Sequence, residues 1–134
     1  MRMKNDHLLI DSFTWLEILK GSETGKKALE LMKDKKLLTS ALNLYEVYYR
    51  VSEIKDIETA KKFLEKIRIH AKITGIDEAT AIEAANIKLE AKKRKTKIGA
   101  IDCLIYATSK INRATLLTGD EHFKDFEQVI YLEG

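Results

Sequence analysis

Short apolar runs alternate along the chain with longer segments in which apolar residues recur at the spacing of a helix. The short runs are residues 8–10, 37–39, 73–76, 114–118 and 129–132. Runs of this length, bounded by polar residues, are typical of buried strands. Strands that alternate with helices in this way favour an α/β fold, in which a mostly parallel sheet lies between helices.

Two of the intervening segments show the helical period most clearly. Their apolar positions are Ile57, Ala60, Leu64 and Ile67 in one segment, and Ile82, Ala85 and Leu89 in the other. Lys and Glu occupy many positions between them, so we expect each stripe to cover the sheet. Ser22 and Asp77 precede helical segments and suit the N-cap, because a short side-chain oxygen accepts from an unpaired backbone N–H. The helix after Ser22 is expected to end at about Lys33.

Composition narrows the class of protein. Of the 134 residues, 45% are hydrophobic and 34% are charged, which is enough apolar material for one core and too much for a disordered chain. The sequence has no proline and 6 scattered glycines, so no linker divides it and we expect a single domain over residues 1–134. The formal net charge of +3 is too small to identify a nucleic-acid partner by itself.

The apolar runs are too short to cross a membrane, which takes ~20 residues in a helix. The first of them is also too short for the centre of a secretory signal. We therefore place the protein in the cytoplasm. Cys103 is the single cysteine, so it forms no internal disulfide and cannot by itself build a cysteine-based zinc site.

Isolated carboxylates are the most informative chemical feature. Three acids are each the only Asp, Glu, Lys or Arg in a long stretch, namely Asp11 in 7–16, Glu46 in 37–49 and Asp102 in 98–109. A fourth, Asp120, follows the strand-like run 114–118. Asp11 and Asp120 therefore lie where strands end, at the edge of a parallel sheet where ligands bind.

Carboxylates brought together at that edge repel one another unless a cation holds them ionised. Without a cluster of thiolates or imidazoles, such a site suits Mg²⁺ or Mn²⁺ better than zinc. An ion of this kind can activate water and neutralise charge that develops on a phosphodiester. The four acids together therefore indicate metal-assisted phosphodiester hydrolysis.

Each acid also has a structural interpretation. Asp11 and Asp120 could cap the next helix or close a turn. Glu46 could form a capping box with Asn43, although the helix more plausibly begins near Ser40.

The segment that carries Asp102 has alternatives of its own. On a helix, Asp102 would share a face with Tyr106, Ser109 and Arg113, so that face could be merely polar and exposed. Cys103, considered with His7, His70 and His122, could indicate a thiol nucleophile, but a reactive thiol needs an electropositive and partly exposed setting. His122 follows Asp120 closely enough to reach the crevice at the strand ends, although we expect a histidine in a surface loop.

The four acid-bearing segments, in this order, resemble those of the PIN-domain ribonucleases, and the short chain is most similar to the VapC-type toxins of type II toxin–antitoxin systems. The similar segments are a strand with Asp in 8–12, a helix with Glu in 39–46, the Asp-containing segment 100–108 and the strand end 117–123. No one of these segments is specific. Their combination in a chain of this length is specific.

This resemblance implies a three-layer α/β/α sandwich with a parallel five-stranded sheet of order 3-2-1-4-5, and metal-dependent hydrolysis of RNA. Asp11, Glu46, Asp102 and, more peripherally, Asp120 would hold Mg²⁺ or Mn²⁺ and orient the attacking water. Ser12 or Thr118 would hydrogen-bond a carboxylate or that water. The resemblance also implies a homodimer and neutralisation by a cognate VapB-type antitoxin.

Basic and aromatic residues supply candidates for other contacts. Arg50 lies one helical turn beyond Glu46 and could touch substrate phosphate or pair with that acid. A basic cluster before Asp102 could attract RNA phosphates or form a solvated helix end, and its members are Lys92, Lys93, Arg94, Lys95 and Lys97. We expect the aromatic residues Phe13, Trp15, Tyr45, Tyr48 and Tyr49 in the core or a dimer interface rather than stacked on bases.

Two other functions remain open from the sequence. A haloacid-dehalogenase-like phosphatase would also place Asp11 at a strand end, but it requires a second Asp where this chain has Phe13. A catalytically silent PIN-like scaffold would bind RNA or a partner, although retention of all four acids argues against it. Cleavage of RNA distinguishes the nuclease from both.

Overall fold

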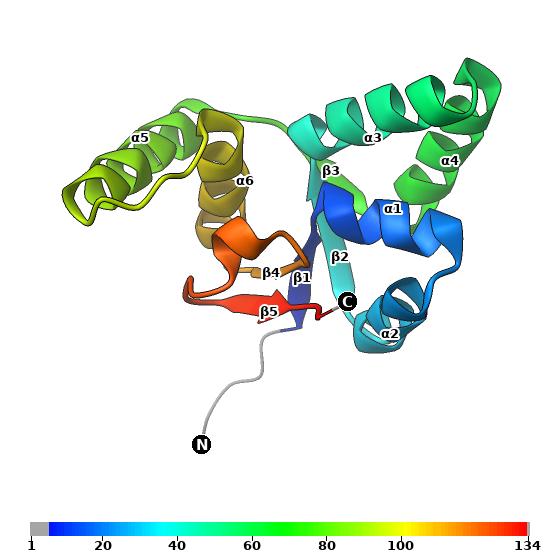
Figure 1. Cartoon of the computed structure of the whole chain (residues 1–134), viewed down its shortest axis with the longest axis horizontal. Helices are drawn as coiled ribbons and strands as arrows, with labels where there is room; N and C mark the ends of the chain where they lie inside the picture. The colour runs from blue at the N-terminus through cyan, green and yellow to red at the C-terminus, as the bar shows by residue number, and fades with distance from the viewer. Residues whose placement is uncertain (1–5, 134) are drawn as a thin grey trace.

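The computed structural model describes residues 6–133, and these form one parallel sheet with helices on both of its faces (Figure 1). The strands are β1 (His7–Ile10), β2 (Lys36–Ser40), β3 (Lys72–Thr74), β4 (Thr115–Thr118) and β5 (Val129–Tyr131). Their order is β3-β2-β1-β4-β5, and every neighbouring pair is parallel. The expected fold and strand order are confirmed. Part of the N-terminal stretch inspected for a secretory signal, residues 1–5, lies outside the described residues.

The helices are divided between the two faces of the sheet. On one side lie α1 (Ser12–Lys20), α2 (Glu23–Met32), α3 (Ala41–Ile54) and α4 (Ile57–His70), and on the other lie α5 (Glu78–Lys93) and α6 (Ala100–Ile111) (Figure 1). A short 3-10 helix, η1 (Glu121–Phe123), follows β4. No helix in residues 6–133 is both long and apolar enough to span a bilayer.

Side chains of β1 alternate between the two faces of the sheet, and each face has its own apolar cluster. Leu8 and Ile10 belong to the apolar cluster under α1–α4, whereas Leu9 belongs to the cluster under α5 and α6. Successive side chains of a strand point to opposite faces, so a strand covered on both sides is apolar throughout. The central strand β1 thereby holds both layers together, and the acid that follows it lies between them.

Sequence patterns located the starts of α2, α3 and α5 but misassigned one buried face. Ser22 and Asp77 cap α2 and α5 as predicted, accepting hydrogen bonds from the backbone N–H groups of Gly25 and Thr80. The stripe expected to bury on α5 is wrong, because Ile82 and Leu89 are each 59% exposed.

The buried side of α5 carries smaller residues. Ala84 and Ala91 are 4% and 7% exposed and belong to the cluster shared with α6, against which α5 packs. Alanines allow the two helices to approach closely, so the larger Ile and Leu side chains are left on the outer face. On α4 the expected stripe is buried at Ala60, Leu64 and Ile67, but Ile57 in the first turn is 54% exposed.

Close packing of α1 on α2 generates a test of the fold. A Cβ on Gly25 would lie 2.3 Å from the backbone oxygen of Glu17 in α1, and backbone cannot move aside as a flexible side chain can. We expect Gly25→Ala to lower the free energy of unfolding by about 1–3 kcal/mol, measured by urea denaturation. Gly75→Ala is the control, since nothing lies within 4 Å of its added Cβ. Equal stabilities of the two variants would contradict this packing.

Candidate active site

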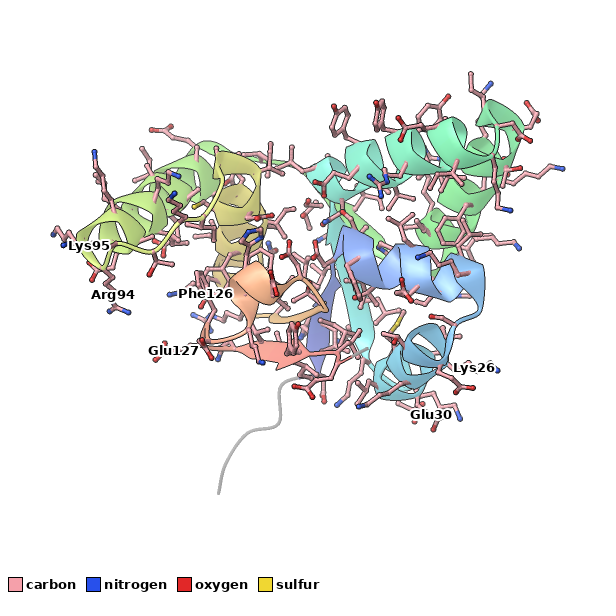
Figure 2. All side chains as sticks on the ribbon, viewed as in Figure 1. Lys26, Glu30, Arg94, Lys95, Phe126 and Glu127 are labelled. Atoms are coloured by element: carbon pink, nitrogen blue, oxygen red, sulfur yellow. The ribbon has the colours of Figure 1, made fainter. Side chains whose placement is uncertain are left out.

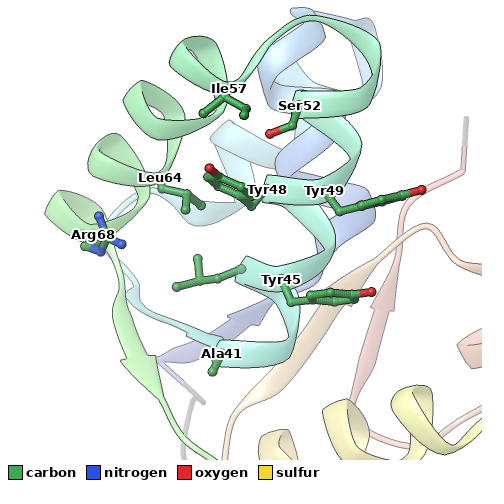
Figure 3. A pocket seen from close by; sticks show the side chains of 9 residues that line it. Ala41, Tyr45, Tyr48, Tyr49, Ser52, Ile57, Leu64 and Arg68 are labelled. Carbon is green, nitrogen blue, oxygen red and sulfur yellow. The ribbon is translucent and has the colours of Figure 1, made fainter.

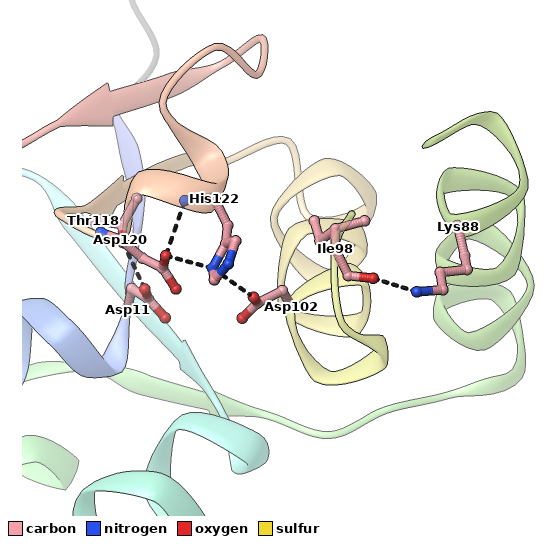
Figure 4. A network of polar contacts seen from close by, with 7 residues as sticks. All are labelled: Asp11, Lys88, Ile98, Asp102, Thr118, Asp120 and His122. Atoms are coloured by element: carbon pink, nitrogen blue, oxygen red, sulfur yellow. Dashed lines mark hydrogen bonds and ion pairs between the residues drawn. The ribbon is translucent and has the colours of Figure 1, made fainter. Parts of the chain in front are cut away.

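Four carboxylates reach the edge of the sheet where the parallel strands end. Asp11 directly follows β1, and Asp120 follows the adjacent strand β4 by two residues. Asp102 lies in the first turn of α6, and Glu46 lies on α3. Figure 4 shows Asp11, Asp120 and Asp102 side by side in this region. The structure therefore brings together side chains that are far apart in the sequence.

Asp11 is the most deeply buried of the four acids, with 4% of its surface exposed. The Nδ2 group of Asn43 donates to its Oδ1 at 3.0 Å, and the Oγ1 hydroxyl of Thr118 donates to its Oδ2 at 2.6 Å. Burial raises the pKa of Asp11 from 3.8 to about 6 despite the hydroxyl of Thr118, and the charges of Glu46 and Asp120 raise it further. The fold therefore fixes this carboxylate without neutralising it.

Asn43 is a site residue that the sequence analysis missed. The proposed capping box between Asn43 and Glu46 is wrong, because Ser40 is the N-cap of α3 and Asn43 completes the box with it. The Oδ1 of Asn43 accepts from the backbone N–H of Ser40, which leaves its Nδ2 to donate to Asp11 and to the Oγ of Ser12. The Ser-x-x-Asn spacing at the expected helix start was the available signal.

Glu46 is half-buried, and its position is set by the start of α1. The Oγ of Ser12 donates to its Oε1 at 2.5 Å, which connects Glu46 through Ser12 and Asn43 to Asp11. Arg50 is exposed, and in the described part of the chain it forms no ion pair with Glu46.

Asp102 and Asp120 form the tightest group of the site, together with His122. The Nδ1 of His122 lies 2.8 Å from Asp120 Oδ1 and 3.5 Å from Asp102 Oδ2 (Figure 4). One ligand atom from each of the three residues lies within 4.8 Å of the others. Burial, followed by the charge of Asp120, raises the pKa of Asp102 from 3.8 to about 6, while His122 lowers it.

The setting of α6 removes two alternative interpretations. The face that Asp102 shares with Tyr106 and Ser109 is not a solvated polar face, because these two residues are 6% and 0% exposed. Arg113, also expected on this face, is exposed but lies beyond the end of α6. Cys103 is 1% exposed, and burial raises the pKa of its thiol. A buried thiol of this kind does not serve as a nucleophile. His122, expected in a surface loop, is exposed in η1 and also reaches both carboxylates.

The donor set fits a divalent cation. Among residues 6–133, no Lys or Arg side chain forms an ion pair with Asp11, Glu46, Asp102 or Asp120. Buried or clustered carboxylates without a cationic partner are costly, and carboxylate oxygens are the ligands that Mg²⁺ prefers. The imidazole of His122 contacts both Asp102 and Asp120 and could supply a nitrogen ligand.

Two cavities adjoin the helices that carry these acids. An apolar cavity of about 470 Å³ between α3 and α4 is lined by Tyr45, Tyr48, Leu64 and Arg68 among others (Figure 3). A second, of about 580 Å³, is lined by Lys88, Lys92, Lys97 and His122 among others, and so it meets the acidic group at His122. The Nζ of Lys88 also donates to the carbonyl of Ile98, just before α6 (Figure 4).

The basic cluster of the sequence is thereby divided. Lys92 and Lys97 line the second cavity, whereas Lys93, Arg94 and Lys95 are not among its lining residues. Arg94 forms an exposed ion pair with Glu90 and projects with Lys95 from the far end of α5 (Figure 2).

Comparison with known proteins identifies a family. The model of the PIN domain family matches residues 8–129. No curated protein sequence matches the chain significantly.

Similar solved structures include VapBC2 from Rickettsia felis bound to a promoter DNA fragment, with 23% identity, a TM-score of 0.77, and coverage of 93% of this chain and 96% of that one. A toxin–antitoxin complex from Klebsiella pneumoniae has 20% identity and a TM-score of 0.77, covering 94% and 98%. VapC20 of Mycobacterium tuberculosis, a sarcin-ricin loop cleaving toxin, has 15% identity and a TM-score of 0.68, covering 91% and 98%. These likenesses establish the shared fold.

The raised pKa of Asp11 predicts how stability depends on pH in the metal-free protein. Because its folded pKa of about 6 exceeds the ordinary 3.8, its contribution to stability is fully present below pH 3.8 and is lost as the pH rises through about 6. At about 1.4 kcal/mol per pKa unit, this loss is of order 3 kcal/mol.

Urea denaturation in EDTA at pH 4.5 and 7.5 measures most of this loss, since the first part of it falls between pH 3.8 and 4.5. Asp11→Asn should reduce the difference between the two pH values relative to wild type, and Asp125→Asn, at an exposed position, should not. An unchanged pH dependence in Asp11→Asn would show that the buried carboxylate does not titrate in this range.

Proposed function

The chain belongs to the PIN domain family, and from this premise we propose that it is a metal-dependent endoribonuclease, the VapC-type toxin of a type II toxin–antitoxin pair that acts in the cytoplasm. The observation that carries the proposal is the convergence of four carboxylates at the ends of β1 and β4 with no Lys or Arg paired to them in residues 6–133. The similar VapC20 structure, described as a toxin that cleaves the sarcin-ricin loop, supports RNA as the substrate.

Asp11, Glu46, Asp102 and Asp120 are the residues that we propose to hold Mg²⁺ or Mn²⁺. The bound ion would supply Lewis-acid activation of water and neutralise charge that develops on the phosphodiester. Thr118 and Asn43 orient the carboxylate of Asp11, because each donates to one of its oxygens.

The four acids are held in place by their neighbours, and two of them remain accessible to a substrate. Ser12 fixes Glu46 from the first turn of α1, and Asp120 is fixed by its own turn, in which its backbone N–H donates to Thr118 Oγ1. Asp102 and Asp120 retain 21% and 29% exposure of their side chains, so RNA can reach them from solvent. The buried end of the site is thus rigid, and its outer end is accessible.

We propose that the second cavity binds RNA backbone beside the acids, through Lys92 and Lys97. A cationic cavity adjoining an acidic centre attracts phosphates that the acids alone would repel. Lys93, Arg94 and Lys95 then contribute to the general field rather than to this contact, and Arg50, exposed on α3, is a candidate for a more distant phosphate.

The proposed partners are a VapB-type antitoxin and a second copy of the chain. The similar structures include toxin–antitoxin complexes, and the apolar cavity between α3 and α4 offers a surface for a protein segment rather than for phosphate. Exposed apolar residues also supply surfaces for a homodimer, and they include Tyr45, Tyr49, Ile82 and Leu89. Trp15, by contrast, is buried and donates to Thr39, so it belongs to the core.

The proposal predicts the effect of removing single charges. We expect Asp11→Asn and Asp102→Asn each to lower the rate of RNA cleavage with Mg²⁺ or Mn²⁺ by at least about 100-fold, because a metal ligand is lost, and EDTA to stop cleavage. Asp125→Asn, in the exposed loop after η1, should retain the rate of wild type. Electrophoresis of end-labelled RNA measures the rate, and circular dichroism verifies that the variants fold.

Three results would contradict this function. Full activity of both site variants would remove the acids from the chemistry. Release of phosphate from monoesters while RNA stays intact would favour the phosphatase alternative. Binding of many RNAs without cleavage, with either metal supplied, would favour a silent scaffold.

The division of the basic cluster predicts that two pairs of lysine substitutions affect RNA binding differently. In an Asp102→Asn background that prevents cleavage, Lys92→Gln with Lys97→Gln should weaken RNA binding and lower the slope of log K against log salt by about 1.4, as expected when two phosphate contacts are lost. Lys93→Gln with Lys95→Gln removes the same charge and should change the slope less. Fluorescence anisotropy over a salt series measures both. Equal slopes would show that only overall charge matters.

A further inference from the structure

We propose that His122 is itself a ligand of the divalent ion, so that the site selects first-row transition-metal ions over Mg²⁺. The inference rests on the proposed function, since it concerns the same ion. It adds His122 to the four acids proposed to hold the ion and makes Asp120 a central ligand rather than a peripheral one. Asp102, Asp120 and His122 form the one group in residues 6–133 whose ligand atoms lie within 4.8 Å of one another.

The distances around His122 fit ligands that share one ion. Neighbouring ligands of an octahedral ion, each about 2.1 Å from it, are about 3.0 Å apart. Nδ1 of His122 lies 2.8 Å from Asp120 Oδ1 and 3.5 Å from Asp102 Oδ2, which brackets this value. An ion can therefore be held by these atoms with little movement of the chain.

Local structure brings the imidazole to this position. Asp120 is the N-cap of η1, and its Oδ1 accepts from the backbone N–H of His122 at 3.0 Å. The backbone N–H of Asp120 in turn donates to Thr118, which holds Asp11. The Asp-x-His segment is thus tied by hydrogen bonds to the buried part of the site. Phe123, the next residue, is fully buried and anchors the turn.

The chemistry of the donor atom determines which ion is favoured. Mg²⁺ is a hard ion that takes oxygen ligands and releases its water reluctantly, whereas imidazole suits transition-metal ions. One nitrogen beside two carboxylates therefore improves binding of an ion such as Mn²⁺ more than binding of Mg²⁺. The alternative is that His122 merely forms a surface ion pair with the two carboxylates, and exposed ion pairs contribute little to folding stability.

Binding of Mn²⁺ alone tests the proposal without a measurement of RNA cleavage. Pulsed EPR of Mn²⁺ on the full-length wild-type protein should show modulation from an imidazole nitrogen, and His122→Ala should abolish it. Calorimetric titration should show about tenfold weaker Mn²⁺ binding in His122→Ala, with Mg²⁺ binding changed by no more than about twofold. His70→Ala, at an exposed position at the end of α4, is the matched control and should behave as wild type.

The outcomes separate this inference from the proposed function. Mn²⁺ bound without nitrogen modulation in a wild-type protein that still cleaves RNA would overturn the ligand role and leave the nuclease intact. Equal losses of Mn²⁺ and Mg²⁺ affinity in His122→Ala would overturn the selectivity. A folded wild-type protein that binds neither metal would overturn both proposals. The spectrum of the wild-type protein decides the ligand role even if His122→Ala fails to fold.

Discussion

The main constraint on this structure is that it must hold mutually repelling carboxylates close together at the ends of β1 and β4. Burial and neighbouring negative charge raise the pKa values of Asp11 and Asp102, so the fold does not stabilise their charged forms as a salt bridge would. The protein instead holds Asp11 with the amide of Asn43 and the hydroxyl of Thr118, and it holds Glu46 with the hydroxyl of Ser12. Asp102 faces the imidazole of His122. The neutral donors around Asp11 and Glu46 fix geometry while leaving negative charge available to a cation.

The rest of the fold fixes the positions of the acids at this edge of the sheet. Strand β1 is covered on both faces, so Asp11 emerges between two apolar layers that cannot easily shift. Each of the other acids comes from an element packed against one of these layers. Binding of an ion would therefore stabilise the native state through a site whose geometry the two cores already impose.

Much of this architecture could be predicted from the sequence, because it depends on local patterns. The isolation of Asp11, Glu46 and Asp102 among apolar residues signalled buried charge, and the alternation of strands and helices signalled the sheet. The pattern on α5 was misleading because alanines occur on several faces of this helix. Periodicity alone therefore could not show that Ala84 rather than Ile82 would be buried. Packing between two helices decided that question, and a single sequence does not record it.

Asn43 was missed, and His122 was favoured as a surface residue, for a related reason. Both are polar residues of common types near a turn, and their importance follows from contacts with Asp11 and with Asp102, which are distant in the sequence.

The unequal anchoring of Asp11 and Asp102 has a consequence for how such a protein can lose activity over evolutionary time. The oxygens of Asp11 receive donors from two buried residues, so replacing it disturbs hydrogen bonds that join α3 and β4 to β1. Asp102 faces the exposed His122, and its replacement leaves those hydrogen bonds in place. A descendant under no selection for the proposed cleavage would therefore lose Asp102 more readily than Asp11, because Asp11 also supports the packing of the fold.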